Sequence, residues 1–245
     1  MNPRSILHSL LAAAFAIGLA AGQDAPAIVD DEAFSNLPEE KRNEFVQHMQ
    51  QASKLFAEKR IFETLEELSK AEAIYPDSAA LVNIQGSCYV EFRDFERARK
   101  TFQRALKLAP DTPSIRFNIA EVDFCTKQWQ QAHDSFSEIL KQLPEEQTAM
   151  RRLVEFKMLL CKLKIGQVDE ARKMVDNHGF MDDSPYHFFA QAALAFHDGK
   201  TVDAEQWLGR GTRIFRNPQI LAPWQDTMIE FGYIKSFYGG DLADE

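Results

Sequence analysis

The chain has few cysteines and none of the short motifs that mark common catalytic and metal sites. Three cysteines in 245 residues do not suit a disulfide framework, because such a framework needs an even number. Motifs of the forms H-E-x-x-H, paired C-x-x-C, G-x-S-x-G and the phosphate loop are absent from the sequence. His187 and His197 fall on one expected helix, but at about 1.5 Å per residue they stand too far apart to share an ion. We therefore predict that the protein is not an enzyme and has no catalytic residue, metal or cofactor.

Basic residues are also fewer than acidic residues. The 37 aspartates and glutamates outnumber the 28 lysines and arginines, and the net charge is -9 at pH 7. A general binder of nucleic acids or of anionic membranes needs a basic surface. The composition therefore argues against nucleic acid as a partner.

Only one long apolar run occurs, at the N-terminus. Residues 6–21 are almost continuously apolar, Arg4 precedes them, and the run closes with the small residues Ala20-Ala21-Gly22. This arrangement is typical of a secretory signal peptide. We expect residues 1–22 to be a cleaved signal peptide and the mature protein to be periplasmic or extracellular, with no integral membrane segment after cleavage. A retained anchor is the alternative, although about 20 apolar residues are needed to span a bilayer.

The three cysteines, Cys88, Cys125 and Cys161, all fall within expected helices. One interpretation is that they are small buried hydrophobic residues. The other is that two form a bridge and one thiol is left, although cysteines on stacked helices rarely reach the spacing that a bridge demands.

The sequence does contain a repeat of 34 residues. Prolines, small residues and bulky apolar residues all recur at this spacing. The matching sets are Pro76, Pro110 and Pro144; Ala98 and Ala132; Phe102 and Phe136; Gly86 and Ala120; and Ile61, Phe95 and Trp129. Self-similarity at a fixed period of this length is typical of stacked structural repeats.

Helical periodicity covers most of the chain after an acidic stretch. Residues 23–36 are acidic and small without a clear period, and we interpret them as a flexible linker. Residues 37–238 follow a pattern of helix, short turn and helix, and residues 239–245 form an acidic tail that we expect to be disordered. The expected helix pairs are 45–78, 79–112, 113–146, a longer fourth pair from 147 and a fifth pair from 184.

The later part of the chain departs from the regular spacing. The fourth pair has five additional residues, which we expect to lengthen its first helix to about 147–164. Gly166 is expected to break this helix and Gly179 to cap the next one. A last helix is expected from 218 to about 237, where Gly239-Gly240 stops it, and it would cover the exposed face of the final pair.

These residues resemble the tetratricopeptide repeat. The second pair matches the intervals of that family through Gly86, Tyr89, Ala98, Phe102, Ala105 and Pro110. The third pair resembles it through Ala120, Ala132, Phe136 and Pro144. The resemblance extends over residues 45–217. It implies an all-α protein, a right-handed α-solenoid of about five helix-turn-helix repeats with a C-terminal capping helix.

The resemblance also implies a concave groove, because the first helices in this family line a groove that commonly holds a peptide or a helix. By helical phase, the expected lining residues are Asn83, Ser87, Phe117, Asn118, Glu121, Phe124, Phe156, Leu160, Tyr186, Phe189 and Phe196. Phase alone does not separate groove from packing. The aromatic members are therefore either core residues or an exposed patch, which would mark a partner unless the last helix covers it.

A row of basic residues runs along the second helix of the second pair. Its members are Arg93, Arg97, Lys100, Arg104 and Lys107. The last four recur at three- and four-residue spacing, which places them on one helix face. A solvated outer face is the favoured interpretation, and docking of an acidic partner is the alternative.

We therefore expect an exported, non-enzymatic scaffold that holds a protein or peptide segment by apolar anchoring in an aromatic groove. Polar residues such as Asn83, Asn118 and Glu121 would set the orientation of that segment. The alternative is a structural or assembly subunit, in which the aromatic half and the last helix pack against another copy or a larger envelope complex. The partner and the oligomeric state do not follow from the sequence.

Overall fold

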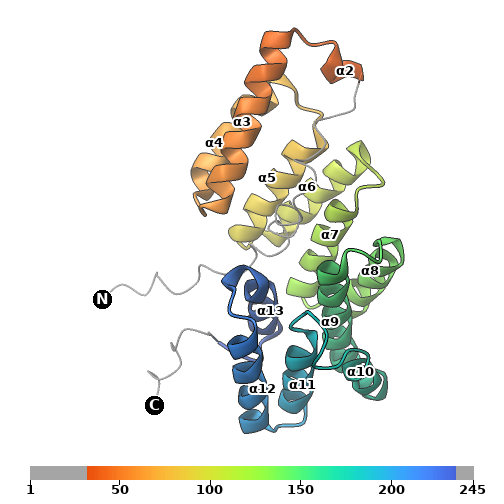
Figure 1. Cartoon of the computed structure of the whole chain (residues 1–245). Coiled ribbons are helices and arrows are strands. Elements are labelled where there is room, and N and C mark those ends of the chain that lie inside the picture. Colours follow the sequence, from red (N-terminus) through yellow and green to blue (C-terminus); the bar gives the residue numbers. More distant parts are fainter. Residues whose placement is uncertain (1–31, 236–245) are drawn as a thin grey trace. The chain divides into compact units, whose positions relative to one another are not determined.

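A computed structural model describes residues 32–235, which form helices joined mostly by short turns and contain no strand (Figure 1). These residues fall into two compact units, 32–122 and 123–235. The predicted signal peptide, residues 23–31 of the predicted linker, and the predicted acidic tail lie outside the described part. The helices are α2 (Glu32–Ser35), α3 (Glu39–Ala57), α4 (Ile61–Ile74), α5 (Ala79–Glu91), α6 (Phe95–Leu108), α7 (Pro113–Cys125), α8 (Trp129–Gln142), α9 (Thr148–Lys164), α10 (Val168–Val175), α11 (Tyr186–His197), α12 (Thr201–Ile214) and α13 (Pro218–Phe231).

Consecutive helices form antiparallel hairpins, as the repeat pattern predicts. Helix α3 packs on α4, α5 on α6, and α11 on α12. Within the described residues, five consecutive pairs run from α3–α4 to α11–α12, and α13 follows alone. This confirms the predicted all-α architecture, an α-solenoid of helix-turn-helix repeats with a closing helix. Nowhere in residues 32–235 is there a helix long and apolar enough to cross a membrane.

The turn that ends each first helix has one hydrogen-bonded form throughout. At the end of α5, for example, the N–H of Asp94 donates to the carbonyl of Tyr89 at 2.9 Å. This is the Schellman arrangement, which needs a left-handed residue just after the helix. The left-handed residues are Lys59, Arg93, Lys127, Gly166, Gly199 and Gly232. The first three keep the 34-residue period, but they are lysine or arginine rather than glycine.

Helix α13 ends in the same turn as the first helices, with the N–H of Tyr233 donating to the carbonyl of Met228 at 3.1 Å. Helix α13 ends at Phe231, and Gly232 adopts φ +87° in the following turn. The helix therefore stops before the predicted end at 237, because Gly232 supplies the left-handed cap in place of the predicted Gly239-Gly240. Helix α10 also ends early, at Val175 with Asp176 as its C-cap, so the prediction of Gly179 as its cap is wrong.

The end of the predicted linker belongs to the folded structure. Residues 32–35 form α2, and the Phe34 side chain is buried. Its ring centroid lies 5.2 Å from that of Phe45 and 5.4 Å from that of Tyr75. The linker prediction is corrected for these residues, because one buried aromatic side chain is enough to anchor a short helix to the first repeat.

Small residues allow the two helices of a hairpin to approach closely. A Cβ atom placed on Gly86 of α5 would lie 2.5 Å from Cε1 of Phe102 on α6, a distance that real Cβ contacts do not reach. Phe102 is itself 1% exposed, so its ring has no free space to move into. The 34-residue recurrence of small and bulky residues therefore reflects helix–helix contact.

The cysteines are not bridged: Cys88, Cys125 and Cys161 are all outside any disulfide. Cys88 and Cys161 are fully buried, which confirms for these two the interpretation as small core residues. Burial raises the pKa of Cys88 to about 12, so its thiol stays protonated and unreactive at neutral pH.

The contact at Gly86 generates a paired prediction. Gly86→Ala should lower the free energy of unfolding by roughly 1–3 kcal/mol, because the added methyl group overpacks the site against Phe102. Gly209→Ala on α12 is the matched control, since a Cβ added there would meet no atom within 4 Å. That change should raise stability by about 0.5–1 kcal/mol. Urea unfolding followed by circular dichroism measures both, and equal effects of the two substitutions would contradict the contact.

The left-handed turn residues generate a second prediction. Lys127→Gly should stabilise the protein by up to about 1 kcal/mol, because it removes the Cβ penalty of a left-handed residue. Gly166→Lys should destabilise it by about 1–2 kcal/mol for the same reason. Nothing lies within 4 Å of a Cβ at Gly166, so a steric clash does not account for the loss. Thermal unfolding of the two variants should shift in opposite directions, and a shift in the same direction would rule out the backbone explanation.

Candidate functional site

The predicted groove residues divide between the two compact units, and each part is described by itself. Residues 32–122 contain Asn83 and Ser87 on α5 and Phe117, Asn118 and Glu121 on α7. Residues 123–235 contain Phe124, Phe156, Leu160, Tyr186, Phe189 and Phe196. The first set is mainly polar and the second is mainly aromatic.

The aromatic set surrounds one tryptophan of α13. The ring of Trp224 lies 5.3 Å from that of Phe156 and 5.8 Å from that of Phe189. Tyr186 is 6.4 Å from Trp224, and its hydroxyl donates to the Met174 carbonyl at 2.7 Å. Phe156, Phe189 and Tyr186 are each 0% exposed. Helix α13 thus inserts an aromatic side chain between the first helices α9 and α11.

A second aromatic contact lies at the C-terminal end of α13. The ring of Phe231 stacks on Phe124 at 6.0 Å and meets Trp129 edge-on at 5.3 Å. Just beyond the helix, Tyr233 stacks on Phe196 at 5.3 Å. The last helix and its turn therefore cover the aromatic residues that helical phase placed on the first helices.

These contacts correct the prediction of an open aromatic groove and confirm the alternative interpretation, in which the last helix covers these side chains. Phe124, Phe156, Leu160, Tyr186 and Phe189 are core residues, all at most 1% exposed, and Phe196 is half-buried. Sequence reasoning missed the residues that cover them. Their spacing carried a signal, because Trp224 and Phe231 stand seven residues apart and so share one face of the last helix.

The polar set centres on a contact between two asparagines. Nδ2 of Asn118 on α7 donates to Oδ1 of Asn83 on α5 at 2.9 Å. The Ser87 hydroxyl donates to the Asn83 carbonyl at 3.2 Å. The prediction correctly placed these residues on neighbouring first helices. Phe117 is 1% exposed and is a core residue, so it does not line a groove.

The asparagine pair keeps hydrogen-bonding capacity. A side-chain amide has two N–H donors and a carbonyl oxygen with two lone pairs. Asn83 is half-buried, and Asn118, Ser87 and Glu121 are buried. Across residues 32–235, no further hydrogen bond uses Nδ2 of Asn83 or Oδ1 of Asn118. One donor on Asn83 and one acceptor on Asn118 are thus left, and a peptide backbone presents the complementary C=O and N–H.

The basic row on α6 is largely occupied by local contacts. Arg97 pairs with Asp94 at 3.4 Å, and Arg104 pairs with Glu72 at 3.2 Å. The guanidinium of Arg93 lies 4.9 Å above the ring of Phe95. These contacts favour a solvated, locally neutralised face over a docking surface.

Comparison with known proteins supports the repeat architecture. The family model described as tetratricopeptide repeat matches residues 63–113 and 85–122, which span α4 to α7. Pseudomonas aeruginosa PilF has a similar structure, with a TM-score of 0.55, 14% sequence identity, and coverage of 79% of this chain and 94% of that chain. YrrB, described as a TPR protein with an unusual peptide-binding site, has a TM-score of 0.52, 18% identity, and coverage of 77% and 95%. At these identities the likeness is one of fold. The helix hairpins and these matches together show tetratricopeptide repeats in residues 63–122, and the described part of the chain shares its fold with the tetratricopeptide-repeat protein YrrB.

Proposed function

We propose that this protein is a non-enzymatic scaffold that holds an extended peptide segment of a partner protein on α5 and α7. Stacked repeats of this kind commonly act through extended binding surfaces. The description of YrrB as having a peptide-binding site supports a peptide as the class of partner.

The observation that carries this proposal is the Asn83–Asn118 contact. It leaves a donor on Asn83 and an acceptor on Asn118, so the pair can accept one peptide N–H and donate to one peptide C=O. The contact at 2.9 Å fixes both amides, which lowers the entropy that binding would otherwise cost. Recognition through the backbone would tolerate varied side chains in the bound segment.

The position of α13 supports a peptide site in residues 32–122 rather than in residues 123–235. In residues 123–235, α13 already packs on the aromatic residues of α9 and α11. A partner would have to displace a buried tryptophan, Trp224, to reach that surface. In residues 32–122, the candidate contacts are polar amides, which are suited to reversible hydrogen bonding.

We also propose that the protein acts after export. Residues 1–22 have a charged start, an apolar run and small residues at the end. These features support a cleaved signal peptide. The partner would then be another exported or envelope protein.

Peptides selected from a displayed random library on the purified chain would test the asparagine pair. Asn83→Ala combined with Asn118→Ala should weaken binding of the selected peptides roughly tenfold, because two hydrogen bonds of about 0.5–1.5 kcal/mol each are lost. Asn43→Ala is the matched control, since Asn43 is exposed on α3. Fluorescence anisotropy gives the affinities, and circular dichroism verifies folding. Equal affinities for all three proteins would refute the proposed site.

The mass of the secreted chain tests the export proposal. Expressed with its own N-terminus in a secreting bacterial host, the chain should lose residues 1–22 and begin at Gln23 or close to it. Replacing Ala20 and Gly22 with leucine should block cleavage, because signal peptidase needs small residues at these positions. An uncleaved wild-type chain held in the membrane fraction would instead support the anchor.

A further inference from the structure

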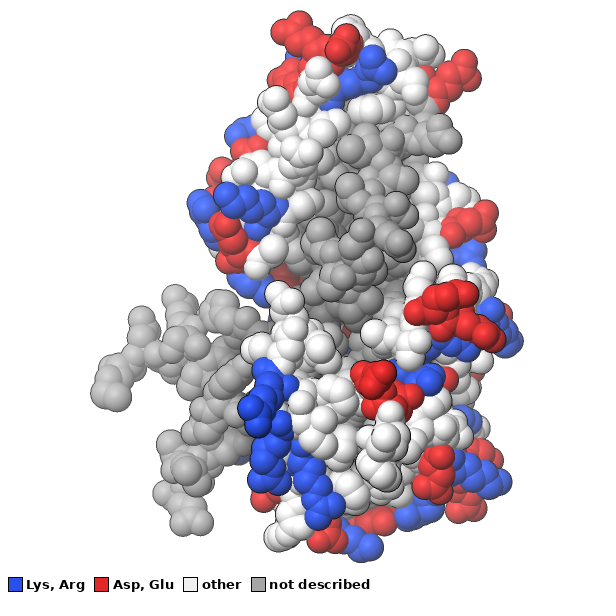
Figure 2. All heavy atoms as spheres, viewed as in Figure 1, with Lys and Arg blue, Asp and Glu red and all other residues white. Residues whose placement is uncertain are grey.

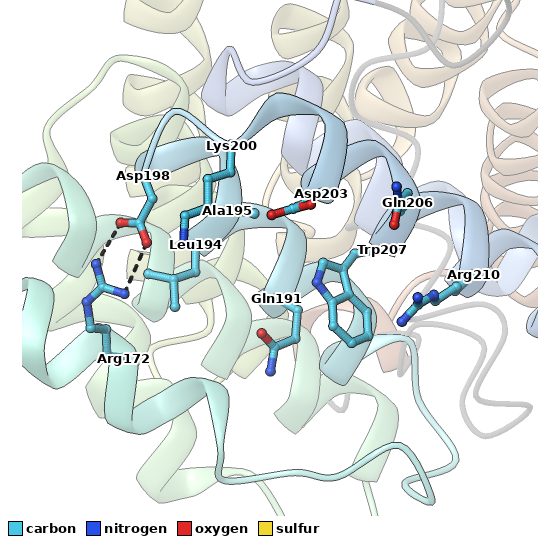
Figure 3. Close-up of a pocket in the computed structure, with 10 residues that line it drawn as sticks. All are labelled: Arg172, Gln191, Leu194, Ala195, Asp198, Lys200, Asp203, Gln206, Trp207 and Arg210. Atoms are coloured by element: carbon cyan, nitrogen blue, oxygen red, sulfur yellow. Dashed lines mark hydrogen bonds and ion pairs between the residues drawn. The ribbon is translucent and has the colours of Figure 1, made fainter.

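The shortness of α10 leaves a hollow beside α12. Helix α10 has 8 residues, whereas the second helices α4, α6, α8 and α12 have 14 each. A cavity of about 380 Å³ lies between α10, α11 and α12. Its walls carry three basic and two acidic side chains beside an indole, and they include Arg172, Gln191, Asp198, Lys200, Asp203, Trp207 and Arg210 (Figure 3). The cavity falls in the size range of binding sites, about 300–1,000 Å³.

The indole of Trp207 forms the aromatic wall of this hollow and packs against neighbouring aromatic side chains. It meets the ring of His187 edge-on at 5.6 Å and packs against Phe188 at 6.4 Å. His187 Nδ1 in turn lies 3.2 Å from the carbonyl oxygen of His178. The guanidinium of Arg210 lies 4.7 Å from the indole centroid. Figure 3 shows Trp207 and Gln191 extending toward the same space. The wall is thus a fixed tryptophan with a stacked arginine, the pair of residue types most enriched at binding hot spots.

The arginines of α12 form no ion pair within the described residues, whereas Lys200 interacts electrostatically with Asp198. Arg172 is held by Asp198 through contacts of 2.6 and 3.2 Å. By contrast, the part of the chain that the structure describes contains no ion pair to Lys200, Arg210, Arg213 or Arg216. Figure 2 shows Lys and Arg side chains gathered over α12, at the lower left of the view. On α6, by comparison, Arg97 and Arg104 pair with carboxylates, and within residues 32–235 the two exposed lysines of that helix have no aromatic side chain stacked beside them as Arg210 has Trp207.

Apolar side chains accompany these charges. Ile214 is 59% exposed and Ile220 is 45% exposed, near the C-terminal end of α12 and in the first turn of α13. Arginine, tryptophan and exposed isoleucine on one stretch of chain offer both charge and apolar contact. A ligand that matches them must be anionic and must carry apolar groups.

We propose that the hollow and the exposed arginines of α12 form a binding site for an acidic peptide segment with apolar side chains. The positive groups run from Lys200 to Arg216, about 24 Å at helical rise. That length exceeds a small anion and matches about seven extended residues. Within a chain of net charge -9, a local basic patch steers a short acidic segment to this place. A nucleic acid or an anionic membrane would extend beyond these groups over a chain of net charge -9, which disfavours such a partner. The site is separate from the asparagine pair and binds side chains rather than backbone.

The indole signals of the three tryptophans allow a direct test with the full mature chain. The probe is a synthetic 12-residue peptide in which glutamates alternate with leucines, and the control probe has lysine in place of glutamate. In ¹⁵N-resolved NMR spectra, the glutamate peptide should shift the Trp207 indole signal in a saturable manner and leave that of Trp224, which is 4% exposed, in place. The affinity should fall as salt rises from 50 to about 300 mM, because ions screen exposed charges.

Charge-neutral variants locate the site. Arg210→Gln combined with Arg213→Gln should weaken binding of the glutamate peptide roughly tenfold, since two charges that face the ligand are removed. The matched control is Lys100→Gln with Lys107→Gln on α6, which changes net charge equally at exposed positions and should change the affinity less than twofold. All four substitutions are on the surface, and unchanged thermal unfolding verifies the fold.

Several results would overturn the proposal. The first is a Trp207 indole signal that does not shift when the glutamate peptide is added. The second is a loss of affinity in the α6 control variant as large as that in the α12 variant. The third is binding of the lysine peptide as tight as that of the glutamate peptide. Tighter binding to phosphatidylglycerol vesicles than to the peptide would assign the surface to a membrane. A shift of the Trp207 signal on self-association, or on removal of residues 236–245, would assign it to a second copy or to the chain's own acidic terminus.

Discussion

The close approach of the two helices in a hairpin is the contact on which the rest of this structure depends. On α5, Gly86 leaves space that the ring of Phe102 fills, and on α12 a Cβ at Gly211 would lie 3.0 Å from Cβ of Phe188. Such tight pairs bury one face of each helix and leave the other apolar face for the next repeat. In the described residues, the last pair is followed by the single helix α13, which inserts Trp224 between Phe156 of α9 and Phe189 of α11.

This way of closing the array has consequences for binding. The aromatic side chains of the first helices in residues 123–235 are used to hold α13, so they stabilise the fold and are not presented to a partner. The groups suited to recognition are of two other kinds. In residues 32–122, the amides of Asn83 and Asn118 match a peptide backbone. In residues 123–235, Trp207 and Arg210 match acidic and apolar side chains.

Sequence reasoning recovered the repeats because helix contact imposes spacing. The 34-residue recurrence of Gly86 and Ala120, or of Phe102 and Phe136, reports positions that must be small or bulky. It did not identify the left-handed conformation that the turns share, because Lys59, Arg93 and Lys127 adopt it although glycine normally signals it. The hydrogen bonds of the turn stabilise that conformation, and a residue type alone does not reveal them.

The limits of helical phase explain the rest. Helical phase predicts the face of its own helix on which a residue lies. For Asn83 and Asn118 this was sufficient, because the two side chains meet between neighbouring first helices. Whether that face is open depends on a different helix, often far along the chain. Phe156 is therefore buried because α13 packs over it. The hollow at Trp207 is present because α10 ends early. Local periodicity is a property of each segment, whereas covering a surface is a property of the packed assembly, and only the folded chain establishes it.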